Sequence, residues 1–167
     1  RMLSPGNVRA EPADACVHRH FEQQAARTPD RTALIFDGRS MTYAELDARA
    51  NQLARRLAAF GVGPDVLVGL CVERSIEMLV GLIAIHKAGG AYVPLDPVYP
   101  KDRIAHMVDD SRIAVLLTQQ RLLDELPRHG ARVICLDSDW PSIRTWFSGR
   151  CQPRGRTISV AVRSLRR

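Results

Sequence analysis

The sequence has little that would carry a protein into or across a membrane. Its longest strongly apolar stretch is MLVGLIAI at 78–85, whereas a helix needs roughly 20 such residues to span a bilayer. The first residues, RMLSPGNVRAEPADAC, contain no apolar run of the kind found in a signal peptide. We therefore expect a soluble, cytoplasmic protein, and the initial arginine indicates a piece of a longer chain.

The sequence also lacks the motifs that mark common catalytic and metal sites. Its four cysteines are Cys16, Cys71, Cys135 and Cys151. They form no Cys-x-x-Cys pair and no histidine cluster accompanies them, so we expect no metal site. Cys71 and Cys135 lie in apolar runs, where a free thiol behaves as a small buried hydrophobe. No P-loop, Gly-x-Ser-x-Gly or His-Glu-x-x-His motif is present, and GVGPDV at 61–66 is typical of a helix-end turn.

Acidic residues are absent from the last part of the chain. Residues 1–140 carry 17 Lys and Arg against 18 Asp and Glu, whereas residues 141–167 carry seven Arg and no acid. The net charge of +6 therefore comes from this end of the chain. Because basic arms bind nucleic acid through its phosphates, a non-catalytic α/β protein with a nucleic-acid-binding tail is one alternative, although no repeated motif supports it.

Apolar segments alternate between helix-like and strand-like patterns from residue 16 onwards. Helices are expected at 16–28, 42–60, 75–88, 100–110 and 119–127, and strands at 32–37, 66–72, 91–95, 113–118 and 132–137. The helix after Thr42 is the clearest, because Thr42 and Glu45 form a capping box and Gly61 can end the helix. Ser75 can cap a helix whose apolar residues surround its axis, which predicts a deeply buried position. Strand and helix in turn predict an α/β domain with a largely parallel sheet.

The stretch KAGGAYVPLDPVYPKDRI at 87–104 concentrates glycine and proline. Gly89 can end the preceding helix in the left-handed conformation, and Gly90 lets the chain turn into the next strand. Pro94 lacks an amide donor, which predicts an edge strand, and Pro100 suits the first turn of a helix. The proline spacing also permits a polyproline ligand. The apolar helix before the stretch and the periodic helix after it favour a packed scaffold.

Two stretches resemble the first two signatures of amino-acid adenylation domains from nonribosomal peptide synthetases. They are MTYAELDARANQLARRL at 41–57 and KAGGAYVPLDPVYPKDRI at 87–104. The resemblance runs from about Cys16 to Trp140. Adenylation domains belong to the wider family of adenylate-forming, AMP-binding enzymes. It implies that both signatures build scaffold in the early part of the large N-terminal domain. His86 stands where the family commonly has leucine, and we expect it to pack beside its neighbours rather than to act in catalysis.

The resemblance also implies a chemistry whose parts have no counterpart in this sequence. Family members join an amino-acid carboxylate to ATP with Mg²⁺ and pass the aminoacyl group to phosphopantetheine on a carrier domain. They use a Gly/Ser/Thr-rich phosphate loop, a substrate pocket, acidic residues for ribose and metal, and a lysine of a mobile C-terminal domain. We therefore expect no catalytic, cofactor-binding or metal-binding residue in this chain. Activity would need the remainder of the adenylation domain, with carrier and condensation domains as partners.

The expected organisation has three parts. Residues 1–15 form a linker, residues 16–140 the N-terminal part of an adenylation domain, and residues 141–167 a basic tail that is disordered or results from a frameshift. The leading expectation is thus a fragment of an amino-acid-activating ligase that is inactive alone. A third alternative is a subunit that a separate C-terminal chain completes. The amino-acid substrate cannot be inferred, because no residue of the selectivity pocket is recognisable.

Overall fold

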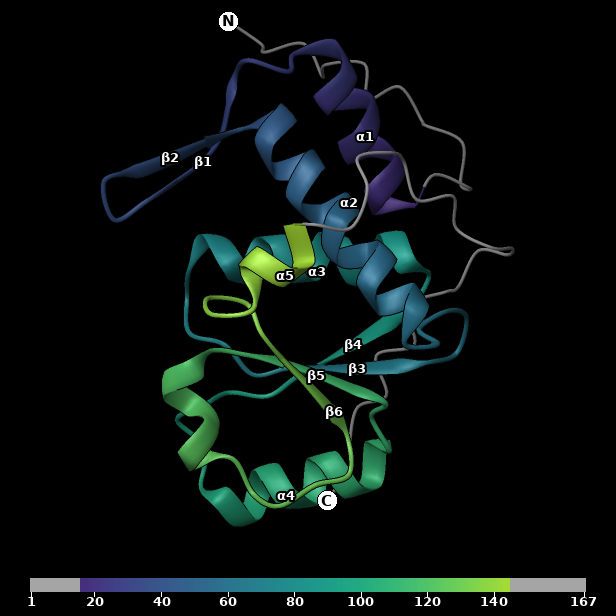
Figure 1. Cartoon of the computed structure of the whole chain (residues 1–167), viewed down its shortest axis with the longest axis vertical. Helices are drawn as coiled ribbons and strands as arrows, with labels where there is room; N and C mark the ends of the chain where they lie inside the picture. Colours follow the sequence, from purple (N-terminus) through teal and green to yellow (C-terminus); the bar gives the residue numbers. More distant parts are fainter. Residues whose placement is uncertain (1–15, 145–167) are drawn as a thin grey trace, which may run out of the picture.

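A computed structural model describes residues 16–144 of the chain. These residues form an antiparallel two-stranded hairpin and a four-stranded sheet whose strands all pair in parallel. Figure 1 shows α2 and α3 on one side of the sheet and α4 on the other. The predicted α/β class with a largely parallel sheet is confirmed. The linker expected at 1–15 and the tail from 145 onwards lie outside the described residues.

An antiparallel hairpin joins the first two helices. The elements are α1 Val17–Arg27, β1 Thr32–Phe36, β2 Arg39–Thr42 and α2 Tyr43–Ala59. Asp37 and Gly38 have φ angles of 49° and 70°, so the turn that Asp-Gly predicted is present between β1 and β2. The sequence did not predict β2, because most of this strand is exposed and Met41 is its buried residue. A strand with so little apolar material has no alternating pattern to recognise.

Helix α2 begins at the predicted capping box. The Glu45 amide donates to Thr42 Oγ1 at 3.2 Å, and the Thr42 amide donates to Glu45 Oε2 at 2.8 Å. These two bonds satisfy amides that otherwise have no partner in the first turn of the helix. Gly61 follows the helix with a φ of 86°, a conformation that glycine adopts without steric cost. Both predicted ends of the helix are therefore confirmed.

The parallel sheet has the strand order β4-β3-β5-β6. Its strands are β3 Leu67–Leu70, β4 Ala91–Pro94, β5 Val115–Thr118 and β6 Arg132–Cys135. All four residues of β5 are buried, as expected of a central strand covered on both faces. Pro94 lies in β4 at the edge of the sheet, where the missing amide costs no hydrogen bond, so the predicted edge strand is confirmed.

The remaining helices cover the two faces of the sheet. They are α3 Ile76–Ala88, α4 Lys101–Ser111, η1 Gln120–Glu125 and α5 Trp140–Arg144. Ser75 Oγ accepts from the Met78 amide at 3.2 Å, which confirms the predicted cap of α3. The segment expected as a helix near 119–127 forms the short 3₁₀ helix η1 instead. Pro127 follows closely after it and limits the turns that an α-helix could add.

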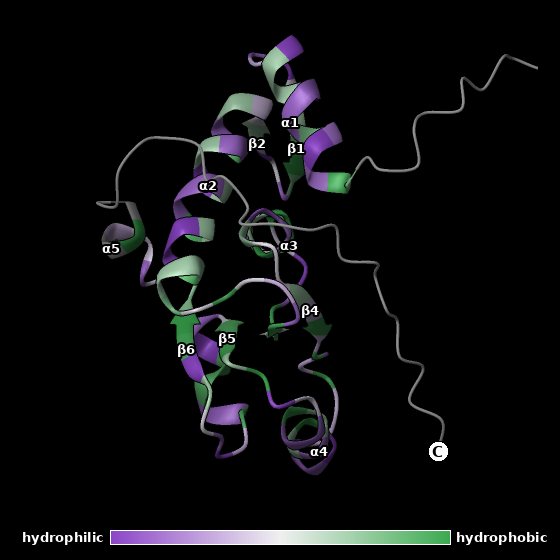
Figure 2. Ribbon diagram, turned by 90° about the vertical axis from the view of Figure 1, so that its right-hand side faces the viewer, coloured by the Kyte–Doolittle hydropathy of each residue, from purple (hydrophilic) through white to green (hydrophobic). Residues whose placement is uncertain are grey.

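Two apolar clusters fill the space on either side of the sheet. The larger one joins α2 and α3 to the side chains of Val68, Val115 and Ile134, and the smaller one joins α4 to Cys71 and Leu116. Figure 2 shows the apolar strands enclosed between α3 and α4. Adjacent residues of β5 thus point to opposite clusters, in line with the period of two in a strand. The predicted deep position of α3 is confirmed, because every residue from Ile76 to Ala88 is buried or partly buried.

The core extends past residue 140, where the basic tail was expected to start. Helix α5 crosses that boundary, and Ile143 is 1% exposed within the larger cluster. The Ile143 amide donates to the carbonyl of Asp139 at 3.1 Å, and Asp139 Oδ2 accepts from the Cys135 amide at 2.8 Å. This helix was not predicted, because a helix of five residues with only Trp140 and Ile143 as large apolar side chains is too short to give a periodic signal. Among the helices of residues 16–144, none has the length and apolar character required to cross a membrane.

Candidate functional site

Polar side chains collect at the carboxyl edge of the parallel sheet. The chain leaves β3 through α3 to reach β4 on one side, and returns through α4 to β5 on the other side of β3. The order of the strands therefore reverses between β3 and β5. In open α/β sheets, ligands bind outside the carboxyl ends of the strands at this kind of reversal. The edge next to β3 and β5 is accordingly the candidate site.

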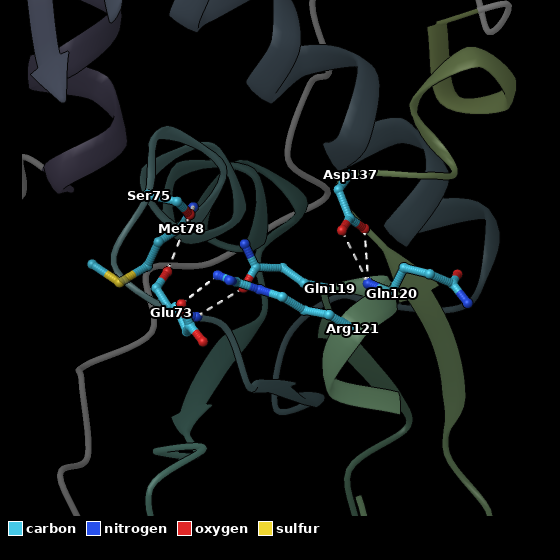
Figure 3. A network of polar contacts seen from close by, with 7 residues as sticks. All are labelled: Glu73, Ser75, Met78, Gln119, Gln120, Arg121 and Asp137. Atoms are coloured by element: carbon cyan, nitrogen blue, oxygen red, sulfur yellow. Dashed lines mark hydrogen bonds and ion pairs between the residues drawn. The ribbon is translucent and has the colours of Figure 1, made fainter. Parts of the chain in front are cut away.

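Three loops supply the polar groups at this edge (Figure 3). Gln119 follows β5, is 7% exposed, and its Oε1 accepts from the Glu73 amide at 3.0 Å. Arg121 makes an ion pair with Glu73, and their side chains are 60% and 46% exposed. Asp137 follows β6 and accepts from the Gln120 amide at 2.9 Å and 3.1 Å with its two oxygens. These contacts connect the loops after β3, β5 and β6.

The groups at this edge do not fit a nucleotide phosphate. Phosphates need cationic or amide donors, yet Glu73 and Asp137 bring carboxylates to the edge and Arg121 is already paired with one of them. Within residues 16–144, no group of three or more His, Cys, Asp and Glu side chains could hold a metal ion. The expectation that the chain carries no catalytic, cofactor or metal residue stays a prediction.

The glycine-rich and proline-rich stretch at 87–104 is packed against the sheet. Gly89 ends α3 with a φ of 84°. A Cβ atom on Gly90 would lie 2.7 Å from Val62 Cγ1 and 3.2 Å from the carbonyl oxygen of Val66. Pro100 is the N-cap residue of α4. Chain geometry explains Gly89, Gly90 and Pro100, as the sequence predicted, and the segment is packed rather than an isolated polyproline ligand.

The cysteines of the described chain are free and poorly suited to nucleophilic chemistry. Burial raises the pKa of the Cys71 thiol to about 11, with the carboxylates of Asp96 and Glu125 adding to the effect. Burial also raises the pKa of Cys135, and the nearby Asp139 carboxylate acts in the same direction. Both thiols stay protonated at neutral pH, and the protonated thiol is a poor nucleophile. The prediction that they behave as buried hydrophobes is confirmed.

A buried charge cluster surrounds Lys87 and was not predicted from the sequence. The Lys87 side chain is 1% exposed, and its Nζ makes an ion pair with Glu22 of α1. The same Nζ lies 3.0 Å from Asp47 Oδ1 and donates to Asn51 Oδ1 at 3.0 Å, both on α2. Asn51 Nδ2 also donates to Asp47 Oδ2 at 2.9 Å. One ammonium group thus connects α1, α2 and α3.

His86, which precedes Lys87 in the sequence, packs against its neighbours as predicted. The ring of His86 lies 5.9 Å from the ring of Tyr92 on β4, edge to face, and burial lowers its pKa. This confirms the expectation that His86 packs. A signal for the cluster was present in the sequence, because a lysine in a helix that is apolar all round must find carboxylates inside the fold. Its partners lie far away in sequence and could not be assigned without the structure.

Fold and strand order together define a portion of an open α/β domain with a parallel sheet. A profile described as AMP-binding enzyme matches residues 21–157, most of the chain, so the chain belongs to this family. The match continues past Trp140, where the resemblance was expected to end. Within the family, the chain is a fragment of an adenylation domain of the nonribosomal peptide synthetase type, because its relatives and structural neighbours are synthetases of this type.

The relatives include large synthetases. A linear gramicidin synthase of Brevibacillus parabrevis is 57% identical over 141 residues, which cover 83% of this chain and 3% of that protein. The solved nonribosomal peptide synthetase FmoA3, bound to α-methyl-L-serine-AMP, has a TM-score of 0.79 and 35% identity, over 87% of this chain and 16% of that one. The N-terminal subdomain of Klebsiella oxytoca NpsA has a TM-score of 0.67 and 26% identity, over 84% of this chain and 34% of that one. The chain therefore spans a small part of the proteins that it resembles.

Proposed function

We propose that this chain supplies the first scaffold layer of an adenylation domain that activates an amino acid with ATP. The observation that carries the proposal is the agreement between the chain and the FmoA3 structure across the described sheet and helices. Residues that the family resemblance marks most strongly, such as Gly90 and Pro94, are occupied in packing and sheet geometry. The chain would thus hold the shape of the domain, and the reacting groups would come from elsewhere.

Several properties of the intact enzyme follow as parts of the same proposal. ATP and Mg²⁺ would bind to the remainder of the adenylation domain, which is also the first partner of this chain. Carrier and condensation domains would be further partners, and the carrier would accept the aminoacyl group on phosphopantetheine. A cytoplasmic location agrees with the free, protonated thiols of Cys71 and Cys135, because reducing compartments keep thiols free.

A domain exchange tests this proposal. Residues 16–144 replace the corresponding segment of an adenylation domain of the gramicidin synthase relative, and ATP–pyrophosphate exchange is measured with a panel of amino acids. We expect exchange within about tenfold of the parent, equivalent to about 1.4 kcal/mol of barrier. We also expect an unchanged amino-acid preference, because the exchanged segment would contribute no pocket residue.

The control for the exchange is a chimaera that also carries Gly90→Val. A larger side chain at this position collides with Val62 and with the Val66 carbonyl, so this chimaera should lose both its folding transition and its activity. A folded chimaera with no exchange activity would contradict the scaffold role. A changed amino-acid preference would show that the segment shapes the pocket.

A second experiment tests whether a separate polypeptide can complete the adenylation domain. The 167-residue chain alone should give no pyrophosphate exchange, and adding the remainder of a related adenylation domain as a second polypeptide tests whether activity returns. Recovered activity would support the two-chain alternative. The nucleic-acid alternative rests on basic residues after 140, and those after 144 lie outside the described residues.

A further inference from the structure

Helix α1 has a small apolar contact with the rest of the domain. Its buried residue is Ala25, at 7% exposed, and Phe21 packs partly against the larger cluster. The Phe21 ring lies 6.0 Å from the ring of Tyr43 on α2. Helix α1 also contacts α3 through the ion pair between Glu22 and Lys87. Because the apolar contact is small, docking of α1 depends to a large degree on this polar contact.

His18 lies beside that polar contact, and its protonation would destabilise the docked position of α1. His18 lies one turn before Glu22 on α1, and its Nε2 is buried without a hydrogen-bond partner in the described structure. In the protonated ring both nitrogens are donors, so the cation would be held with a buried Nε2 donor that has no acceptor, which destabilises the docked state. It would also add a second cation close to the Lys87 ammonium.

The charged groups that act on His18 come from α1 and α3. Glu22 of α1 favours a protonated His18, whereas His86 and Lys87 of α3 and Arg19 of α1 oppose it. Asp47 of α2 belongs to the same cluster, with its Oδ1 3.0 Å from Lys87 Nζ. Burial is the largest effect and lowers the pKa of His18 below its ordinary value.

A second histidine, His86 of α3, also opposes protonation of His18. His86 is in contact with Tyr92 of β4, and burial lowers its pKa as well. When α1 leaves, the His18 imidazole gains access to water and recovers its ordinary affinity for protons. Acid therefore favours the open arrangement of α1 over the docked one.

We propose that the contact of α1 with α2 and α3 is an acid-sensitive latch that releases α1 when His18 takes up a proton, while the sheet stays folded. The latch is a property of the fold and does not depend on the proposed enzymatic role. Acid weakens the docking of α1 because the docked state binds protons less well than the released state. The docked position of α1 is fully stabilised above the ordinary histidine pKa of about 6.5, and this stabilisation is lost as the pH falls below that value.

Hydrogen exchange on the full 167-residue chain tests the latch. Protection factors, which already account for the pH dependence of intrinsic exchange, are measured at pH 7.5 and pH 5.2 for amides of α1 and α2. We expect protection in α1 to fall by about threefold or more at the lower pH, because each unit of pKa difference changes the docking equilibrium tenfold. Protection in α2 should not change. Equal losses in both helices would indicate global unfolding and would overturn the latch.

Two substitutions distinguish the effect of His18 from that of an exposed histidine elsewhere in the fold. His18→Gln keeps a polar side chain that does not titrate, so the loss of α1 protection at low pH should shrink. His106→Gln is the matched control, since His106 is exposed on α4 across the sheet from α1 (Figure 1) and its replacement should leave the wild-type response unchanged. An undiminished response in His18→Gln would overturn the proposal. If His18→Gln loosens α1 at both pH values, the wild-type comparison of α1 with α2 still decides.

Discussion

Replacing Lys87 by methionine removes the cation that connects three helices. Methionine keeps an unbranched side chain of similar length, so the change is chiefly in charge and hydrogen bonding. The variant leaves Glu22 and Asp47 without their counter-ion and Asn51 Oδ1 without its donor. Breaking a fully buried ion pair from one side costs about 3–5 kcal/mol.

The exposure of the two carboxylates reduces that cost. The side chains of Glu22 and Asp47 are 37% and 25% exposed, so water can relieve part of the penalty once the ammonium is gone. We therefore expect the free energy of unfolding to fall by about 2–3 kcal/mol. With a urea dependence of about 1–3 kcal/mol per molar, the midpoint should fall by about 1 M or more.

Urea unfolding followed by far-ultraviolet circular dichroism measures this change. The matched control is Lys101→Met, the same substitution at an exposed lysine whose Nζ donates to the Asp124 carbonyl at 2.7 Å. Losing that exposed bond should cost less than about 1 kcal/mol. If Lys87→Met costs no more than Lys101→Met at the same m-value, the buried ammonium does not stabilise the fold and the reasoning is wrong.

Three further outcomes concern buried groups. Thr118 Oγ1 is buried and has no hydrogen-bond partner within the described part of the chain, so Thr118→Val should raise the free energy of unfolding by about 1 kcal/mol; a loss in the same urea assay would reveal a partner. Gly90→Ala should cost about 1–3 kcal/mol because its Cβ meets Val62, whereas Gly130→Ala, with nothing within 4 Å, should be nearly neutral. Cys71, with a pKa of about 11, should resist alkylation at pH 8 until the chain unfolds, as peptide mass spectrometry would show; rapid labelling of the native chain would contradict its burial.

Local chemistry explains which parts of the fold could be predicted from sequence. The cap at Thr42, the stop at Gly89 and the edge position of Pro94 depend on a few adjacent residues, and all three are present. Strand β2 and helix α5 were missed because each is short and offers a single buried apolar residue, Met41 and Ile143 respectively. In these elements, tertiary packing decides the conformation and leaves no periodic pattern.

The same distinction applies to the polar groups. No local pattern joins Glu22, Asp47 and Lys87, because their proximity depends on how three helices pack. The network of Glu73, Gln119 and Arg121 likewise forms only when β3 and β5 become neighbours around the strand reversal. Residue types can indicate that a buried charge needs a partner, but its identity is a property of the tertiary structure.

Motifs that identify a family need not be the residues that carry out its chemistry. Gly90 allows the end of α3 to approach Val62, and Pro94 ends pairing at one edge of the sheet. A Cβ at Gly90 has no space, and the amide that Pro94 lacks would have no further strand to pair with, so both residues serve the fold even where no reacting group is present. The polar edge at Glu73 and Arg121 meets the general rule for ligand sites in α/β sheets, yet its charges are already paired. Recognition of the family therefore rests on packing, and the chemistry of the intact domain has to be sought in residues that this scaffold positions.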